Sequence, residues 1–250
     1  MTEHLIVERR GAIQVIRMNR SDKKNALTRA MYGRMTEALN AGDADPDVRV
    51  HVFLGVPGAF SSGNDIADFM AYAQGGALGE EVIDFLLALA LSQKPMVSGV
   101  DGIAVGIGTT INLHCDLTFA TRRTVFRTPF VDLGLVPEAG SSLLAPAIIG
   151  RQQAFALLGL GRGFSADRAK TAGLIYEVVD EDDLEREVLA AAEEIAAKPP
   201  QALKIARDLM RGSREELVAR IKEEVRHFSE RLRSTEARAA FEAFMNRKKG

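Results

Sequence analysis

The sequence is organised around residues 128–142, which read T-P-F-V-D-L-G-L-V-P-E-A-G-S-S. One carboxylate, Glu138, stands there between an apolar run and a turn of small residues. Apolar surroundings disfavour the charged form of a carboxyl group, so we expect the pKa of Glu138 to rise toward values useful for proton transfer. The alternative is a glutamate that faces solvent or caps the helix introduced by Ser141 and Ser142.

Upstream, residues 60–66 read F-S-S-G-N-D-I and predict a loop that leads into a helix. Gly63 permits a backbone conformation that other residues resist. Asn64 and Asp65 open the helix, so the Asn64 N–H is one of the amides that have no partner inside it. Such an amide can donate to an anion. An ordinary loop-to-helix cap would have the same pattern.

Residues 100–114, V-D-G-I-A-V-G-I-G-T-T-I-N-L-H, are rich in glycine but do not complete the G-x-G-x-x-G pattern, because Ile111 stands sixth from Gly106. We therefore exclude a nucleotide cofactor here. The glycines permit close backbone approach at a second helix start, where the Ile107 N–H is unpaired, or tight packing of helix on sheet. Two such amides can bind a carbonyl oxygen that becomes negative, while a nearby carboxylate removes the α-proton.

Composition narrows the classes of function. The chain has 250 residues, is 46% hydrophobic and 26% charged, and carries a net charge of −2, which indicates neither nucleic acid nor a membrane surface as a partner. The N-terminus lacks the layout of a signal peptide, and the single cysteine, Cys115, indicates a reducing compartment, so we expect a cytoplasmic protein. The four histidines show no metal-ligand spacing, and we expect no metal site.

The first two hundred residues alternate strands with helices, which predicts βαβ units with right-handed crossovers. The expected strands are residues 5–7 and 13–18 as a hairpin, then 48–54, 95–100, 116–120, 125–127 and 174–179. Residues 55–63 are expected to form a loop. The expected helices are a Thr28-capped helix through Leu39, a short helix capped by Asp65, and residues 81–91, 106–114, 142–149, 152–159, 166–172, 184–197, 201–210, 215–231 and 235–247. We thus expect an α/β core over residues 1–197 and a helical part over residues 198–250.

The helical part has two apolar edges. Leu217, Ile221, Val225 and Phe228 trace one stripe at helical spacing. The last helix carries a further edge, formed by Phe241, Phe244 and Met245. These edges either fold back on the chain or contact a neighbouring subunit, and we expect the last helix to make a subunit contact.

Three motifs occur in order: F-S-S-G-N-D-I, then V-D-G-x-A-x-G-x-G with the tail C-D-L-x-x-A, then T-P-F-x-x-L-G-L-x-P-E-x-G-S-S. Together they resemble the crotonase (enoyl-CoA hydratase/isomerase) superfamily over nearly the whole chain. The resemblance implies a spiral of ββα/βαβ turns with a C-terminal helical region for trimerisation, and a homotrimer or dimer of trimers. It implies an acyl-CoA thioester as substrate, with no separate cofactor.

By the same resemblance, the amides of Asn64 and Ile107 form the oxyanion hole. The implied substrate- and CoA-binding residues are Lys24, Ala26, Ser61, Ser62, Gly63, Asn64, Asp65, Ile66, Gly106, Gly108 and Phe130, with the adenine end along residues 24–26 and 61–66.

The chain departs from the hydratases of this superfamily at two positions. Hydratases carry two glutamates that act on water, and Thr110 and Phe130 stand there instead. Glu138 falls where Δ3,Δ2-enoyl-CoA isomerases of the peroxisomal type keep their catalytic glutamate. The resemblance therefore implies isomerisation.

Two alternatives remain open. One is a hydratase or another acyl-CoA enzyme of this superfamily, using a displaced carboxylate from Asp65, Asp68 or Asp132. The other is a non-catalytic member that binds acyl-CoA or protein.

Overall fold

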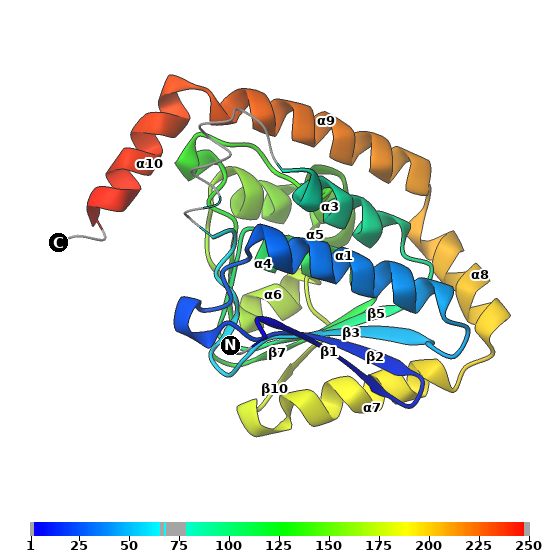
Figure 1. The fold of residues 1–250 in the computed structure, drawn as a ribbon. Helices are drawn as coiled ribbons and strands as arrows, with labels where there is room; N and C mark the ends of the chain where they lie inside the picture. The colour runs from blue at the N-terminus through cyan, green and yellow to red at the C-terminus, as the bar shows by residue number, and fades with distance from the viewer. Residues whose placement is uncertain (1–2, 66–67, 69–78, 248–250) are drawn as a thin grey trace.

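The computed structural model describes residues 3–65, 68 and 79–247 (Figure 1). In this part of the chain the strands form a larger and a smaller sheet, with helices on both faces of the larger one. The predicted helix capped by Asp65 falls largely on residues 66–67 and 69–78, which lie outside the described residues.

The larger sheet has the strand order β1-β2-β3-β5-β7-β10. Its strands are β1 (Leu5–Arg10), β2 (Ile13–Met18), β3 (Val50–Leu54), β5 (Met96–Val100), β7 (Leu117–Thr121) and β10 (Glu177–Val179). The predicted hairpin is confirmed, since β1 pairs antiparallel with β2. Every other neighbouring pair is parallel, as expected for strands joined by helical crossovers.

The smaller sheet has the order β4-β6-β8-β9. Its strands are β4 (Ala59–Ser61), β6 (Ile103–Val105), β8 (Val125–Arg127) and β9 (Phe164–Ser165). The prediction of a plain loop over residues 55–63 is therefore wrong, because it contains β4. Pairing of β4 with β6 depends on Gly102, where a Cβ atom would lie 2.0 Å from the carbonyl oxygen of Gly58. A strand of three residues is too short to show a periodic pattern in the sequence. Its pairing depends on a contact between residues that are far apart in the chain.

Each long strand in the middle of the chain is followed directly by a short one: β3 by β4, β5 by β6, and β7 by β8. The long strands enter the larger sheet and the short strands enter the smaller one. The chain therefore repeats the same turn three times and advances by one strand in both sheets, which makes a spiral.

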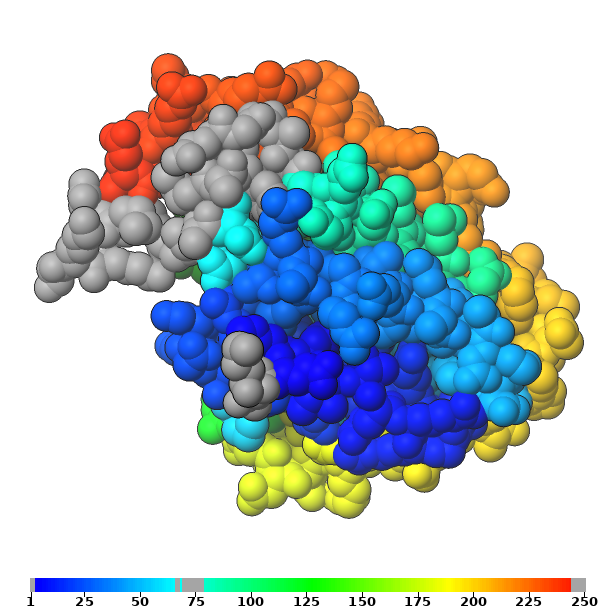
Figure 2. Space-filling view, viewed as in Figure 1, coloured from blue at the N-terminus to red at the C-terminus, as the bar shows by residue number. Residues whose placement is uncertain are grey.

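The larger sheet is covered by different helices on its two faces (Figure 1). On one face α1 (Arg29–Ala44) and α3 (Glu80–Leu91) pack against each other over the main apolar core, and both are visible side by side in Figure 2. On the other face α7 (Leu184–Ala196) buries Leu184, Val188 and Ala192 against the strands. The predicted cap of α1 is confirmed, because the Thr28 side chain accepts a hydrogen bond from the Met31 N–H.

Two predicted helices have different forms in the structure. The helix expected over residues 106–114 is α4 (Ile107–Thr110), continued by the 3₁₀ turn η2 (Ile111–His114). The break expected between the helices over residues 142–149 and 152–159 is confirmed, because Gly150 has a non-helical backbone with φ 73° inside α5 (Ser141–Ala154). The second of these two helices ends as a π-helical turn, η4 (Phe155–Gly159). Three further 3₁₀ turns are η1 (Ser21–Lys23), η3 (Val131–Leu133) and η5 (Glu181–Asp183).

The C-terminal helices fold back on the chain. They are α8 (Pro200–Arg211), α9 (Arg214–Leu232) and α10 (Thr235–Arg247). The shorter helix α6 (Ala166–Ala172) lies earlier in the chain, before β10 and α7. The apolar stripe of α9 is confirmed, since Ile221 and Phe228 are buried in the main core and Leu217 and Val225 pack against it. Phe241 of α10 also packs against this core. The side chains of Phe244 and Met245 lie outside the described ones.

Within the described residues, no helix is both long and apolar enough to cross a membrane. The same part of the chain contains no cluster of three or more His, Cys, Asp or Glu side chains that could hold a metal ion.

Candidate active site

The smaller sheet brings together the two loops that carry the predicted amides. β4 and β6 pair in parallel with Ser61 opposite Ala104, so the segments after both strands leave the sheet at the same edge. Two glycines permit their close approach. A Cβ atom on Gly63 would lie 3.1 Å from the Val105 carbonyl oxygen, and one on Gly108 would lie 2.8 Å from the Ser61 carbonyl oxygen.

The amides of Asn64 and Ile107 have no hydrogen-bond acceptor among the described residues. Leu27 forms a parallel β-bridge with Asn64, but the hydrogen bonds of this bridge involve the neighbours of Asn64. The Leu27 N–H donates to the Gly63 carbonyl, and the Asp65 N–H donates to the Leu27 carbonyl. The Asn64 side chain accepts a hydrogen bond of 2.6 Å from the Tyr32 hydroxyl, which holds this residue in place. Ile107 is the first residue of α4, where an amide has no partner within the helix.

Glu138 is buried, with 5% of its surface exposed. Its Oε1 accepts a hydrogen bond of 2.6 Å from the Thr110 hydroxyl, one helical turn after Ile107. Burial raises the pKa of Glu138 to about 8, the Thr110 hydrogen bond lowers it in part, and the charge of Glu224 raises it further. The expected rise of the pKa is confirmed, and the alternative of a solvated or helix-capping Glu138 is wrong.

The turn after Glu138 is held by two side chains, Glu224 and His114, and the sequence predicted neither of these contacts. Glu224 of α9 accepts hydrogen bonds from the Gly140 N–H at 2.6 Å and the Ser142 N–H at 2.9 Å. His114 Nε2 lies 2.7 Å from the carbonyl oxygen of Ala139. A signal for Glu224 was present, because a glutamate stands at helical spacing between Ile221 and Phe228 on the buried face of α9.

The segments expected to bind the CoA end also meet. Ser61 Oγ donates to the Asn25 carbonyl at 2.8 Å, and the Ser62 N–H donates to the Lys24 carbonyl at 2.9 Å. The two segments around Ala26 and Ser62 therefore lie side by side, with Lys24 exposed. Ile66 lies outside the described residues.

Phe130 is buried and precedes the turn η3. The rival carboxylates have partners away from Glu138. Asp65 is paired with Arg20 at 2.6 Å, the Asp68 carboxylate accepts the Arg29 N–H at 2.9 Å, and Asp132 is paired with Arg127 at 3.1 Å.

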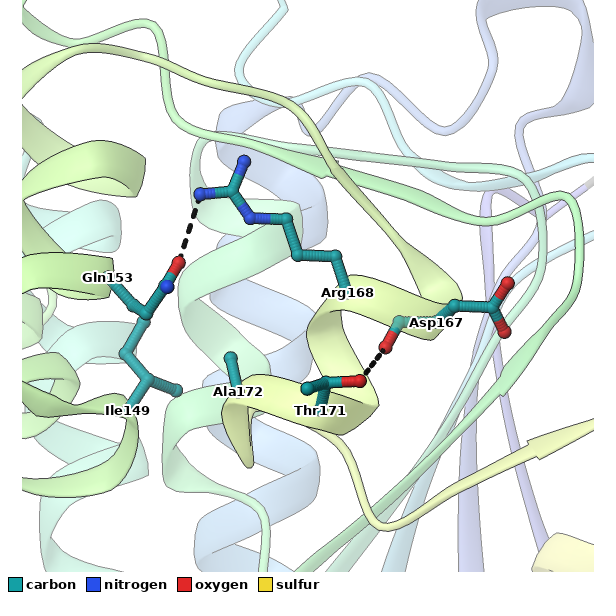
Figure 3. A pocket seen from close by; sticks show the side chains of 6 residues that line it. All are labelled: Ile149, Gln153, Asp167, Arg168, Thr171 and Ala172. Atoms are coloured by element: carbon teal, nitrogen blue, oxygen red, sulfur yellow. Dashed lines mark hydrogen bonds between the residues drawn. The ribbon is translucent and has the colours of Figure 1, made fainter.

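A separate hollow of about 420 Å³ lies between α5 and α6 (Figure 3). Its lining residues are Ile149, Gln153, Asp167, Arg168, Thr171 and Ala172. Figure 3 shows Arg168 reaching across to Gln153, and the hydrogen bond between them measures 2.9 Å. None of the predicted site residues lines this hollow, so it is not part of the candidate active site.

Known proteins share this fold and sequence pattern. Residues 8–250 match the family described as Enoyl-CoA hydratase/isomerase. The chain is 36% identical to enoyl-CoA delta isomerase 2 of Rattus norvegicus over 251 residues, which cover 98% of this chain and 64% of the rat protein. It is 31% identical to a probable enoyl-CoA hydratase of Rhizobium meliloti (strain 1021) over 256 residues, covering 99% of this chain and 96% of that protein. The solved structure of OdaA from Pseudomonas aeruginosa matches with a TM-score of 0.92 at 44% identity, covering 98% of this chain and 99% of that one.

The fold is the crotonase fold, as the motifs predicted. The chain belongs to the enoyl-CoA hydratase/isomerase family. It spans 64% of the length of the rat isomerase that it resembles. Since these two relatives are named for different reactions, the choice between isomerisation and hydration depends on the residues of the site.

Proposed function

We propose that this protein is an isomerase that converts a 3-enoyl-CoA thioester into the conjugated 2-enoyl-CoA, with Glu138 as the single proton-transferring group. The observation that carries the proposal is the buried Glu138 carboxyl, hydrogen-bonded to Thr110 on the same short helix that begins with the unpaired Ile107 amide. A base and an oxyanion donor are thereby joined through one rigid element.

In the proposed reaction, the Glu138 carboxylate removes a proton from C2 of the substrate. The electron pair of the C2–H bond forms a C1–C2 double bond, and the carbonyl π electrons move onto the thioester oxygen. The product of this step is a dienolate. When the carbonyl re-forms, the C1–C2 π pair moves to C2–C3, and the C3–C4 π pair takes the proton back from Glu138 at C4. Glu138 ends as it began, and the double bond has moved by one position.

The amides of Asn64 and Ile107 would donate to the thioester oxygen, where the negative charge collects. One good oxyanion donor is commonly worth on the order of 10²–10³ in rate, and one positioned base on the order of 10²–10⁴. These contributions are sufficient for this reaction with the residues present.

The raised pKa of Glu138, about 8, suits a group that must both accept and return a proton. A carboxylate of higher pKa is a stronger base toward the weakly acidic C2–H. Only the ionised form can begin the reaction, so the rate is expected to rise with pH through this value.

Hydration is the second candidate, and the name of the Rhizobium meliloti relative favours it. Adding water needs a second acid–base group beside Glu138. The Thr110 hydroxyl is already donated to Glu138, and Phe130 offers a buried apolar ring. These contacts favour isomerisation over hydration. A third candidate is a family member that binds acyl-CoA without catalysis, but such a protein would have no use for the raised pKa of Glu138.

The test is to incubate the protein separately with a 3-enoyl-CoA and a 2-enoyl-CoA and to follow the conjugated-enoyl absorbance. We expect a gain with the first substrate and almost no loss with the second. Glu138→Gln keeps the size and hydrogen bonding but cannot take the proton, so its turnover should fall by about 10²-fold or more. Asp132→Asn, six residues upstream, is the matched control and should retain turnover. Ordinary hydration of 2-enoyl-CoA, or normal isomerisation by Glu138→Gln, would refute the assignment.

We also propose that the CoA end of the substrate lies along residues 24–26 and 61–66, with Lys24 near its phosphates. The pairing of Ser62 with Lys24 and the exposure of the Lys24 side chain support this. Lys24→Gln should raise KM for the CoA thioester and leave turnover nearly unchanged. An unchanged KM would contradict this placement.

We propose a homotrimer or dimer of trimers as the assembly. Its support is the outer face of α8, which lies at the edge of the molecule (Figure 2). There Ile205, Leu209 and Met210 are 59%, 80% and 80% exposed. Apolar side chains gathered on one exposed helix face are typical of a surface that meets another protein chain.

A further inference from the structure

We infer that Glu224 is a positioning residue: its carboxylate, reaching in from α9, holds the turn that presents Glu138 and fixes where the proton-transferring carboxyl lies. This inference rests on the proposed role of Glu138. Glu224 itself has no described contact with the Glu138 side chain and acts through the backbone between them.

Glu224 uses both carboxylate oxygens on the first turn of α5. Oε2 accepts the Gly140 N–H at 2.6 Å and Oε1 accepts the Ser142 N–H at 2.9 Å. A negative charge at the start of a helix is also favoured by the helix dipole. The carboxylate therefore caps α5 from a residue more than eighty positions away, two to four residues after Glu138.

Among the described residues, no side chain of the turn itself accepts these two N–H groups. The residue at the N-cap position is Gly140, which has no side chain, and the buried hydroxyl of Ser141 has no hydrogen-bond partner among the described residues. Without Glu224, the buried Gly140 amide and the partly buried Ser142 amide would lose their acceptor. Leaving a buried donor unpaired costs about 1–3 kcal/mol.

The turn also needs an external constraint. Ala139 and Gly140 both have left-handed backbones, with φ of 60° and 69°. An alanine in this region is strained by about 1–2 kcal/mol and stays there only when its surroundings hold it. Because Ala139 follows Glu138 directly, any relaxation of this strain would move the Glu138 backbone.

His114 of η2 also holds this turn. Burial lowers the pKa of His114 to about 4, so its ring is neutral at neutral pH, and Nε2 can donate to the Ala139 carbonyl at 2.7 Å. Arg211 of α8 in turn donates to the His114 carbonyl. The turn is thus held at Ala139 by His114 and at Gly140 and Ser142 by Glu224.

The charge of Glu224 has a second effect. Burial raises the pKa of Glu224, while its hydrogen bonds from residues 140 and 142 and the charge of Arg220 lower it. The like charge of Glu224 raises the pKa of Glu138, whereas the Thr110 hydrogen bond lowers it. Removing the charge of Glu224 should therefore make Glu138 easier to ionise, whereas loosening the turn should misplace it.

Three variants separate these effects. Glu224→Gln removes the charge and leaves one amide facing an NH₂ group. Glu224→Asp keeps the charge but is too short by one methylene to reach both amides. Glu230→Gln is the matched control, since it removes the same charge from an exposed side chain of the same helix, which is paired with Arg226 and not with Arg220.

The measurements are kcat and KM for the 3-enoyl-CoA against pH, together with ¹³C NMR titration of the Glu138 carboxyl in free protein. Both Glu224 variants should lose about tenfold or more in kcat, with KM changed less than about twofold, since a misplaced catalytic group affects chemistry more than binding. In Glu224→Gln alone, the titration of Glu138 and the rising part of the kcat profile should move to lower pH. Glu230→Gln should behave as the parent protein.

Amide hydrogen exchange tests the clamp without substrate. The N–H groups of Gly140 and Ser142 should be protected in the parent protein and should exchange at least about tenfold faster in both Glu224 variants. If a variant failed to fold, measurements on the parent protein alone would still test the positioning role. The Glu138 resonance should report a second titration step from Glu224, and the amides of Gly140 and Ser142 should be protected.

These results also separate the inference from the proposed function. If the parent protein does not isomerise but Glu224→Gln shifts the Glu138 titration and exposes both amides, the function is wrong and the positioning role stands. If the amides exchange freely in the parent protein, or if Glu224→Gln leaves kcat, the titration and the exchange unchanged, the positioning role is refuted.

Discussion

The hydroxyl of Thr110 offers the most direct test of how the environment of Glu138 sets its acidity. Thr110→Val keeps the shape of a buried side chain but removes the donor that lies 2.6 Å from Oε1. The hydrogen bond stabilises the ionised carboxyl, so its loss must raise the pKa of Glu138 above its present value of about 8.

The size of the effect follows from the energy of one such bond. A hydrogen bond to a charged group is worth about 1.5–3 kcal/mol, and one pKa unit corresponds to about 1.4 kcal/mol. The pKa of Glu138 should therefore rise by about one to two units. At pH 7 about a tenth of the parent carboxyl is ionised, since its pKa is about 8. In the variant this fraction falls about ten- to one-hundred-fold.

The assay is the pH dependence of kcat for conversion of a 3-enoyl-CoA, read as conjugated-enoyl absorbance. Thr110→Val should lose activity at pH 7 and recover most of it at about pH 10, where Glu138 is ionised again. Thr109→Val is the control, because the neighbouring Thr109 hydroxyl donates to the Ala104 carbonyl at 2.6 Å and not to Glu138. It should lower the melting temperature without moving the profile. A Thr110→Val profile that coincides with that of the parent would refute this account of Glu138.

Three further predictions concern stability, geometry and assembly. The pKa of Glu138 is raised on folding, so the free energy of unfolding of the parent relative to Glu138→Gln should fall by a few kcal/mol as pH rises from about 4.5 to about 8, measured by chemical denaturation. Equal pH dependence of the unfolding free energy in both proteins would contradict a buried carboxyl. Gly108→Ala would place a Cβ atom 2.8 Å from the Ser61 carbonyl oxygen, so it should push apart the two loops that carry the amides and cut kcat by about tenfold or more; normal turnover would place the amides elsewhere. Leu209→Glu on α8 should reduce the mass measured by light scattering if this exposed face joins subunits, and a monomeric parent would rule out the trimer.

Much of the fold was predictable because its signals are local. The hairpin of β1 and β2, the cap of α1 at Thr28 and the apolar stripe of α9 each depend on residues within a few positions of one another. The rise in the pKa of Glu138 was also predictable, because the residues just before it are apolar.

The short strands of the second sheet were not predictable in the same way. β4, β6 and β9 have two or three residues, too few to show a period, and they exist because the spiral lays them edge to edge. By contrast, the break at Gly150 inside α5 was predictable, because glycine tolerates the left-handed backbone found there, with φ 73°.

By itself, the sequence determined the family, the fold and the identity of the candidate base, because ordered motifs and apolar neighbours are properties of the chain. Only the tertiary structure decided what surrounds that base. Thr110 lies 28 positions from Glu138 in the sequence, and Glu224 lies 84 positions from Gly140. Hydrogen bonds over such separations have no spacing rule, since they form only when helices from different parts of the chain pack against one another and burial removes the competing water.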